Sequence, residues 1–360
     1  MDSSSTPTLS SETFLVDSTP SFDLKVLAKR YVPNPPFKLS SSPHAITLVC
    51  FHATGFFKET WEPLLQRLLS RLQETQDAKS SLQIGDIFSI ESPNHGESAV
   101  LNEEVLERVY GDTWSNSIYS RAAMEFLTAG EERGAKIDFS KRRLVGVGHS
   151  MGAAAMVMLV NMAPSLHFER LICIEAAVSR PDIPGRFEMS KALTYLAWTR
   201  KDVWTSHKSA MKEFKSNPVY SQWDPRIFEL FSRYALRTHP AARYAEPYCF
   251  KGITTALTKR QEAACYRDEE LVYRALKEYA ELTRKMPVHV IFGDTPDISP
   301  GELQSVHTDK DLGCYPTSVS YVRDVGHLAV QQAPDATADE IFEVLKKFSA
   351  SNRSEIKAAL

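Results

Sequence analysis

The 360-residue sequence has almost no charge imbalance, few cysteines and no long apolar run. Its 42 basic and 45 acidic residues give a net charge of −3, which offers no electrostatic case for nucleic acid as a partner. Five cysteines without a C-x-x-C pair are too few for a disulfide scaffold and favour a reducing compartment. The most apolar run, 153–160, is far too short for stable membrane insertion. With these classes excluded, the composition is that of a soluble globular protein.

The chain also has little that resembles a targeting signal or a metal-ligand pattern. Residues 1–5 carry no apolar segment, so an intracellular, cytoplasmic protein is expected. Residues 358–360 weakly resemble a peroxisomal C-terminal tripeptide but have no basic middle residue, which leaves a peroxisomal location as the alternative. The ten histidines are not spaced as a zinc set, and we predict neither a metal nor a cofactor.

Short apolar runs alternate with amphipathic stretches along most of the chain. The runs predict buried strands at 45–51, 87–90, 143–148, 171–174, 288–292 and 318–322. The amphipathic stretches predict helices near 59–75, 115–133, 151–162 and 336–348. This alternation predicts an α/β protein with a mostly parallel sheet covered on both faces. Residues 14–32 could add one or two antiparallel edge strands.

The segment 180–285 differs in pattern from the rest. It shows no convincing strand, and it holds 16 of the 36 aromatic residues. With 20 basic and 13 acidic residues its net charge is +7, against −10 for the remainder. We predict a disordered tail at 1–10, a core formed by 11–179 and 286–360, and a helical lid at 180–285. The aromatic residues would form the lid's own core, line a pocket beneath it, or do both: Trp198, Trp204, Trp223, Phe228, Phe231, Tyr234 and Tyr244.

The most informative motif is Gly148-His149-Ser150-Met151-Gly152, which matches G-x-S-x-G between a predicted strand and an apolar helix. A serine on such a turn needs small residues two positions before and after it, because the neighbouring chains pass closely. The backbone N–H of Met151, at the start of the helix, would then stabilise an oxyanion. The pattern indicates Ser150 as a nucleophile.

With this motif the chain resembles an α/β-hydrolase over nearly all of its length beyond the first 40 residues. The segment 51–56, Phe-His-Ala-Thr-Gly-Phe, resembles the family's His-Gly loop, although Ala53 replaces the usual glycine. By position, the resemblance makes the backbone N–H of Thr54 the second oxyanion donor. The segment 92–98 resembles the G-H-G-x-S turn, in which His95 is a structural residue. The resemblance also implies the lid's place, between the sixth and seventh strands.

The resemblance places the base at His327, in the loop between the last predicted strand and the last helix. Two carboxylates compete to orient it. Asp297 is preferred, because it lies four residues after Gly293 and gives the family's chain order of Ser, Asp and His. Glu175 is the rival, because it ends an apolar strand, where a buried charge needs a partner.

These residues predict hydrolysis of a carboxylic ester, lactone or thioester of a partly apolar small molecule through an acyl-enzyme on Ser150. The positive segment could instead favour an anionic acyl-CoA. A transacylase using the same residues, a hydroxynitrile-lyase-like acid/base enzyme and a non-catalytic ligand receptor stay open as alternatives. The layout is similar to that of fungal hydrolases of the peroxisomal-lipase and toxin-biosynthesis type, on the segments 52–56 and 293–297.

Overall fold

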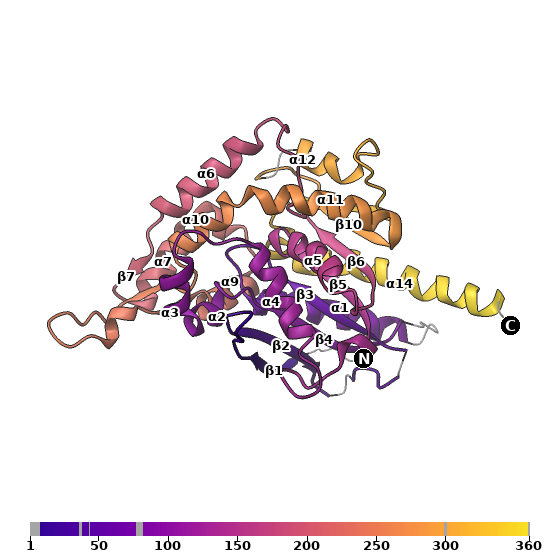
Figure 1. Cartoon of the computed structure of the whole chain (residues 1–360), viewed down its shortest axis with the longest axis horizontal. Helices are drawn as coiled ribbons and strands as arrows, with labels where there is room; N and C mark the ends of the chain where they lie inside the picture. The colour runs from indigo at the N-terminus through magenta and orange to yellow at the C-terminus, as the bar shows by residue number, and fades with distance from the viewer. Residues whose placement is uncertain (1–7, 36–37, 43, 77–81, 299–300, 359–360) are drawn as a thin grey trace, which may run out of the picture.

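An eight-stranded sheet forms the centre of the computed structural model, which describes residues 8–35, 38–42, 44–76, 82–298 and 301–358 (Figure 1). The strand order is β1-β2-β4-β3-β5-β6-β10-β11. The six strands from β4 to β11 in this order are parallel, and β2 is antiparallel to both of its neighbours. The predicted mostly parallel sheet is therefore confirmed. The bounds are β1 (Leu9–Val16), β2 (Val26–Pro33), β3 (Ile46–Phe51), β4 (Ile84–Ile90), β5 (Arg143–His149), β6 (Phe168–Ile174), β10 (Val288–Gly293) and β11 (Ser318–Val322).

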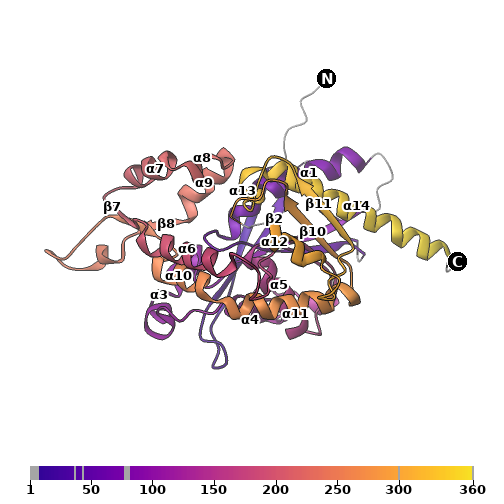
Figure 2. The same ribbon diagram turned by 90° about the horizontal axis from the view of Figure 1, so that it is seen from above.

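Helices cover both faces of the sheet, as Figure 2 shows from above. On one face, α1 and α14 bury a stripe of leucines and other apolar residues against β3, β4 and β5. On the other face, α4, α5 and α11 share a second buried cluster with the same sheet. Strands buried on both faces explain the continuous apolar runs of the sequence. The bounds are α1 (Glu62–Gln76), α4 (Ser117–Leu127), α5 (Met151–Met162), α11 (Glu269–Lys285) and α14 (Pro334–Ala358).

Shorter helices lie in the loops around the strand ends. They are α2 (Gly96–Leu101), α3 (Glu103–Val105), α12 (Gly301–Ser305) and α13 (Ala329–Gln332). No helix in the described part of the chain is both long and apolar enough to cross a bilayer. No three His, Cys, Asp or Glu side chains there gather as ligands for a metal ion.

At the N-terminus the structure differs from the predicted tail. Leu9 and Ser10 belong to β1 and pair with Pro33 and Val32, while residues 1–7 lie outside the described residues. Most of β1 is exposed or half-buried, so its serines and threonines are compatible with an edge strand. Composition alone therefore could not distinguish this strand from a loose tail.

Residues 180–285, called the insert below, leave the sheet after β6 and return to it at β10. The insert is mostly helical, but it also contains a three-stranded antiparallel sheet that the sequence did not indicate. These strands are only two or three residues long, too short to show an alternating pattern. The elements are α6 (Arg186–Thr199), β7 (Val203–Trp204), α7 (His207–Ser216), α8 (Pro218–Ser221), α9 (Pro225–Tyr234), β8 (Leu236–Thr238), β9 (Ile253–Thr255), α10 (Lys259–Arg267) and α11.

The insert joins the core at several places, including one at α11 and one at the start of α9. Helix α11 packs against α5 and buries its apolar face in the core cluster. At its start, the Asp268 carboxylate accepts from the Asn116 backbone N–H at 2.5 Å, which fixes the joint to the start of α4. At the start of α9, the backbone N–H of Asp224 donates to the carbonyl of Gln331 at 2.8 Å. The insert is thus held over the carboxyl ends of the parallel strands.

Candidate active site

Ser150 lies on the sharp turn between β5 and α5. Its φ of +52° and ψ of −120° fall outside the regions that residues with a side chain ordinarily adopt. The Ser150 N–H donates to the carbonyl of Ile174 at 2.9 Å, and its carbonyl accepts from the N–H of Ala177 at 3.1 Å. Contacts from β6 and the residues after it therefore hold the strained turn.

Two glycines allow this turn to form. A Cβ on Gly148 would overlap the backbone of Ala153, and a Cβ on Gly152 would overlap the carbonyl oxygens of Phe51 and His52. The start of α5 consequently lies directly against the end of β3. This close approach is the physical reason for the small residues on either side of Ser150.

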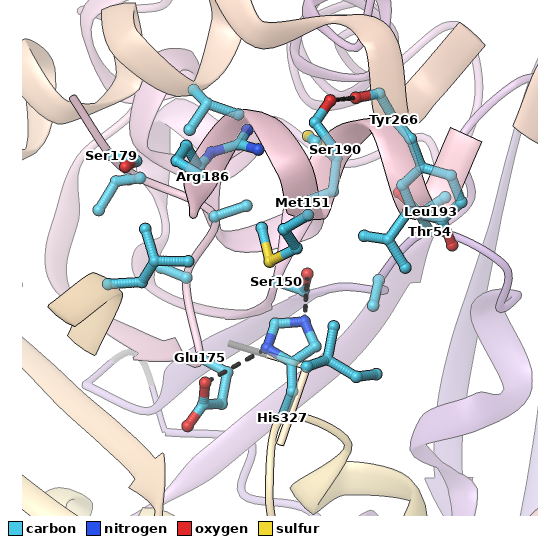
Figure 3. A pocket seen from close by; sticks show the side chains of 18 of the residues that line it. Thr54, Ser150, Met151, Glu175, Ser179, Arg186, Ser190, Leu193, Tyr266 and His327 are labelled. Atoms are coloured by element: carbon cyan, nitrogen blue, oxygen red, sulfur yellow. Dashed lines mark hydrogen bonds and ion pairs between the residues drawn. The ribbon is translucent and has the colours of Figure 1, made fainter. Parts of the chain in front are cut away.

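His327 connects Ser150 with Glu175, as Figure 3 shows. Its Nε2 lies 2.9 Å from the Ser150 Oγ, and its Nδ1 lies 3.2 Å from Oε2 of Glu175. With the proton on Nδ1, the imidazole donates to the carboxylate and accepts from the hydroxyl. A hydroxyl, an imidazole and a carboxylate are thus joined by hydrogen bonds, the arrangement that a nucleophile, a base and an orienting acid require.

Glu175 follows β6 and is almost fully buried, at 3% exposure. Its Oε1 accepts from the Gly293 N–H at 2.8 Å and from Nε2 of Gln304 at 2.9 Å. Burial by itself would raise the pKa of this carboxyl. The hydrogen bonds and the charge interaction with His327, together with the bonds from Gly293 and Gln304, outweigh burial and hold the pKa below its ordinary value. Glu175 is therefore an anion at neutral pH.

Asp297, the carboxylate that the sequence favours, lies elsewhere in the site. Its Oδ1 accepts from the backbone N–H of His327 at 2.8 Å and from that of Ile298 at 2.5 Å. Its carboxylate packs against the Cα of Gly326. The structure thus brings Glu175, and not Asp297, to the imidazole ring. The reason is that the chain beyond β10 turns toward the backbone of the histidine loop, whereas Glu175 leaves β6 facing the ring itself.

The two predicted oxyanion donors border the same pocket as Ser150. Thr54 follows β3, and Met151 is the first residue of α5. Within the described ranges, neither backbone N–H donates to an acceptor of the protein. Since the first N–H groups of a helix have no intrahelical partner, the N–H of Met151 is available to an anion.

Buried histidines support the loop that carries Thr54. Nε2 of His95 accepts from the Gly55 N–H at 3.0 Å, and its Nδ1 donates to the Asn94 side chain at 2.6 Å. The His52 ring packs against the His95 ring at 5.1 Å. Burial lowers the pKa of His52 to about 4 and that of His95 well below its ordinary value. Both rings are neutral supports of the loop.

His149, next to the serine, is also buried. Its Nε2 donates to the carbonyl of His327 at 2.8 Å. Burial lowers its pKa to about 3, so the ring is neutral at physiological pH. This bond holds the backbone of the histidine loop, which gives His149 a structural role.

A pocket of about 140 Å³ lies at Ser150. The core contributes residues near the strand ends, among them Thr54, Glu175 and His327. The insert contributes side chains from α6, α10 and the start of α11. Figure 3 shows this group around Ser150. The pocket wall from the insert consists of Arg186, Met189, Ser190, Leu193, Cys265, Tyr266, Asp268 and Val272.

A second pocket of about 180 Å³ adjoins the first. Both are lined by Thr54, Tyr266, Ile298 and Leu328. Aromatic side chains of the insert line the second pocket and also pack together as a buried cluster, so they form a core and a pocket wall at once. They are Phe214, Tyr220, Trp223 and Phe231.

The other aromatics of the insert have different surroundings. Trp204 belongs to the insert's buried cluster without lining either pocket. Trp198 and Tyr244 are exposed. Trp223 and Phe231 therefore meet both expectations, Trp204 meets one, and Trp198 and Tyr244 meet neither.

Gln304 and Arg186 are among the site residues that were not singled out from the sequence. Gln304 donates to Glu175, and Arg186 lines the pocket from the first turn of α6. Gln304 belongs to no motif. For Arg186, the positive charge of the whole insert was the available signal, and it does not point to one residue.

Comparison with known proteins places these observations in a family. A family model described as the alpha/beta hydrolase family matches residues 48–340. The type I acyl-CoA thioesterase mpaH of Penicillium roqueforti is 26% identical over 261 residues, 72% of this chain and 53% of that protein. The peroxisomal membrane protein LPX1 of Saccharomyces cerevisiae is 23% identical over 313 residues, 84% of this chain and 76% of that protein. The chain spans about half the length of the thioesterases that it matches.

Solved structures show the same fold. The peroxisomal alpha-beta-hydrolase Lpx1 from Saccharomyces cerevisiae superposes with a TM-score of 0.72 at 18% identity, covering 96% of this chain and 90% of that one. The thioesterase domain from the curacin biosynthetic pathway gives a TM-score of 0.58 at 13% identity, covering 92% and 99%. With the family model matching residues 48–340, the chain belongs to the alpha/beta hydrolase family.

Proposed function

We propose that this protein is a serine hydrolase that cleaves a carboxylic ester or thioester through an acyl-enzyme on Ser150. The observation that carries the proposal is the hydrogen-bonded sequence of Ser150, His327 and Glu175 at the base of a pocket. The similarity to an acyl-CoA thioesterase supports the inclusion of thioesters. Lactones share the same bond type and stay within the proposal.

In the proposed mechanism, Oγ of Ser150 attacks the substrate carbonyl while Nε2 of His327 accepts the hydroxyl proton. Glu175 stabilises the imidazolium and keeps the proton on Nδ1. The N–H groups of Met151 and Thr54 stabilise the oxyanion of the tetrahedral intermediate. His327 then protonates the leaving group, and water hydrolyses the acyl-enzyme by the same steps in reverse order.

We also propose that the insert acts as a lid. Its α6 and α10 form one wall of the pocket at Ser150, and its aromatic cluster borders the adjoining pocket. An acyl chain in these pockets would be removed from water, which stabilises a partly apolar substrate by about 25 cal/mol per Å² of apolar surface that it buries.

The test is substitution of Ser150→Ala, assayed with a series of p-nitrophenyl acyl esters and acyl-CoA thioesters. We expect kcat/KM to fall by at least about 10³-fold, because the nucleophile is removed while the oxyanion donors remain. A fluorophosphonate should phosphonylate the wild-type serine with loss of fluoride and leave the Ser150→Ala variant unlabelled. Ser216→Ala, an exposed serine of the insert, is the matched control. Retained hydrolysis by Ser150→Ala would refute the proposal.

The compartment is a separate proposal. The names of the yeast matches refer to the peroxisome, which supports testing that compartment beside the cytoplasm for this chain. A fluorescent protein fused to the N-terminus, imaged with a peroxisomal marker, distinguishes the two.

A further inference from the structure

Arg186 is a buried cation at the pocket. It is 6% exposed, and it lines the pocket together with Ser150. Within the described residues, its guanidinium forms no hydrogen bond or ion pair, and it interacts electrostatically with Tyr273. The Tyr273 hydroxyl already donates to Glu269 at 2.7 Å. A buried charge without a counter-charge is costly, so this arrangement calls for an explanation.

Other arginines of the insert show the ordinary arrangement. The Arg200 guanidinium pairs with Glu262 at 2.6 Å and donates to the carbonyl of Leu257. Arg226 pairs with Asp224 at 2.8 Å and with Asp335 at 2.9 Å. The absence of a protein partner for Arg186, among the residues described, therefore sets it apart from these neighbours.

The carboxylates that line the pocket are engaged elsewhere. Asp268 accepts from the Ser115 hydroxyl and from the N–H groups of Asn116 and Leu271. Glu175 is engaged by Gly293, Gln304 and the His327 ring. Neither carboxylate lies within ion-pair distance of Arg186, so the positive charge is available to whatever enters the pocket.

The backbone around Arg186 is well defined. Arg186 is the first residue of α6, after Gly185 at φ +75°. The Arg186 N–H donates to the carbonyl of Ile183 at 3.1 Å. Figure 3 shows the guanidinium directed toward the middle of the lining side chains, on the far side of Met151 from His327. Arg186 and Ser150 thus belong to different parts of the pocket wall.

We propose that Arg186 binds a carboxylate of the substrate, remote from the scissile carbonyl. This inference rests on the proposed function and narrows its substrate class to esters or thioesters that carry a free carboxylate. A planar guanidinium fork matches a carboxylate in charge and geometry. A phosphate dianion would leave one negative charge uncompensated among the apolar side chains of Met189, Leu193 and Val272.

The test compares charged substrates with neutral counterparts in two arms. One arm uses p-nitrophenyl half-esters of straight-chain dicarboxylic acids and their methyl-capped diesters, so that the carboxylate is on the acyl half. The other uses 4-carboxyphenyl butyrate and its methyl ester, so that the carboxylate is on the leaving group. We expect the wild type to favour the charged member by about 10- to 100-fold in kcat/KM in one of the two arms.

Arg186→Met should abolish that preference, and Arg186→Lys should retain part of it, because lysine keeps the charge but loses the fork. Lys191→Met, an exposed residue of the same helix, makes the same change of net charge and should keep the preference. Absence of a preference in both arms, or an equal preference in Arg186→Met, would overturn the proposal. So would inhibition by inorganic phosphate without any preference for carboxylates.

A binding measurement separates this inference from the proposed function. A free dicarboxylate such as suberate should raise the melting temperature of Ser150→Ala but not that of the Ser150→Ala/Arg186→Met double variant. If Ser150→Ala still hydrolyses esters, the proposed function fails, while this measurement continues to decide the role of Arg186. Equal shifts in both variants would overturn the role of Arg186 alone.

Discussion

The segments after β6 and after β10 both present a carboxylate to the histidine loop, but to different parts of it. Glu175 contacts the His327 ring, at 3.2 Å from Nδ1. Asp297 contacts the backbone N–H of the same residue, at 2.8 Å. One carboxylate can control where the imidazole proton lies, and the other can control where the loop lies.

The difference teaches that distance along the chain is a weak guide to which atom a side chain reaches. Glu175 immediately follows a strand in the middle of the sheet and has little freedom to point elsewhere. Asp297 lies four residues beyond β10, and its position depends on the path of that connection. The following predictions test whether the two carboxylates differ in role as they differ in contact.

The largest effect is expected for Glu175→Gln. The amide keeps the shape of the side chain but loses the charge that stabilises the imidazolium and the Nδ1 tautomer, so kcat should fall by about 10³- to 10⁴-fold. KM should change little, because the substrate-binding surface is preserved. Steady-state kinetics on one p-nitrophenyl ester measure both. A loss of less than about tenfold would contradict the assignment of Glu175 as the orienting acid.

A smaller effect is expected for Gly326→Ala. A Cβ at this position would overlap the Asp297 carboxylate and displace it from the His327 N–H. We expect kcat/KM to fall by about tenfold, as in Asp297→Ala, because both changes loosen the loop. The double variant should lose no more than either single one, since both act through one contact. Fully additive losses would show that Gly326 acts independently of Asp297.

Gln304→Leu should have a modest effect that depends on pH. Losing the Gln304 donor raises the pKa of Glu175 toward its unfolded value of about 4.3. Because the folded pKa lies below the unfolded one, the stability contributed by Glu175 is present above the unfolded pKa and is lost as pH falls through the folded pKa. The wild type should therefore resist urea better than the variant at pH 7, with the difference shrinking below pH 4. A difference that is independent of pH would contradict this linkage.

The smallest effect is expected for Asp297→Asn. The amide oxygen can still accept from the backbone N–H groups of His327 and Ile298, so kcat/KM should stay within about threefold of the wild type. Measuring kcat/KM for Asp297→Asn and Glu175→Gln under the same conditions compares the two carboxylates most directly. A loss for Asp297→Asn equal to that for Glu175→Gln would restore Asp297 as the acid.

Much of the fold could be predicted because its signals are local. β3 and β10 are buried on both faces and therefore read as continuous apolar runs. The turn at Ser150 could be predicted because close packing requires Gly148 and Gly152. The antiparallel edge strands expected within 14–32 are present as the end of β1 and as β2. The first part of β1, before residue 14, and the small sheet of the insert could not be predicted, since an exposed edge strand and two- or three-residue strands leave no clear pattern.

The site was less predictable where it depends on the paths of loops. His327 lies where the family resemblance puts it, but the choice between Glu175 and Asp297 depends on which way each connection turns. Gln304 and Arg186 reach the site from elements with no motif of their own. Such contacts are visible only in the folded chain. Glu175 and Gln304, for example, are more than a hundred positions apart in the sequence.

The joint at Asp268 has a consequence for protein engineering. Helix α11 is part of the insert by sequence but part of the core by packing, and Asp268 fastens its start to Asn116. A chimera that exchanges the whole of 180–285 would therefore remove one of the helices that cover the sheet. An exchange that ends before Asp268 keeps α11 on the sheet and alters the core cluster only near Ala264 and Cys265, so residues 180–267 are the unit that could be transplanted between relatives.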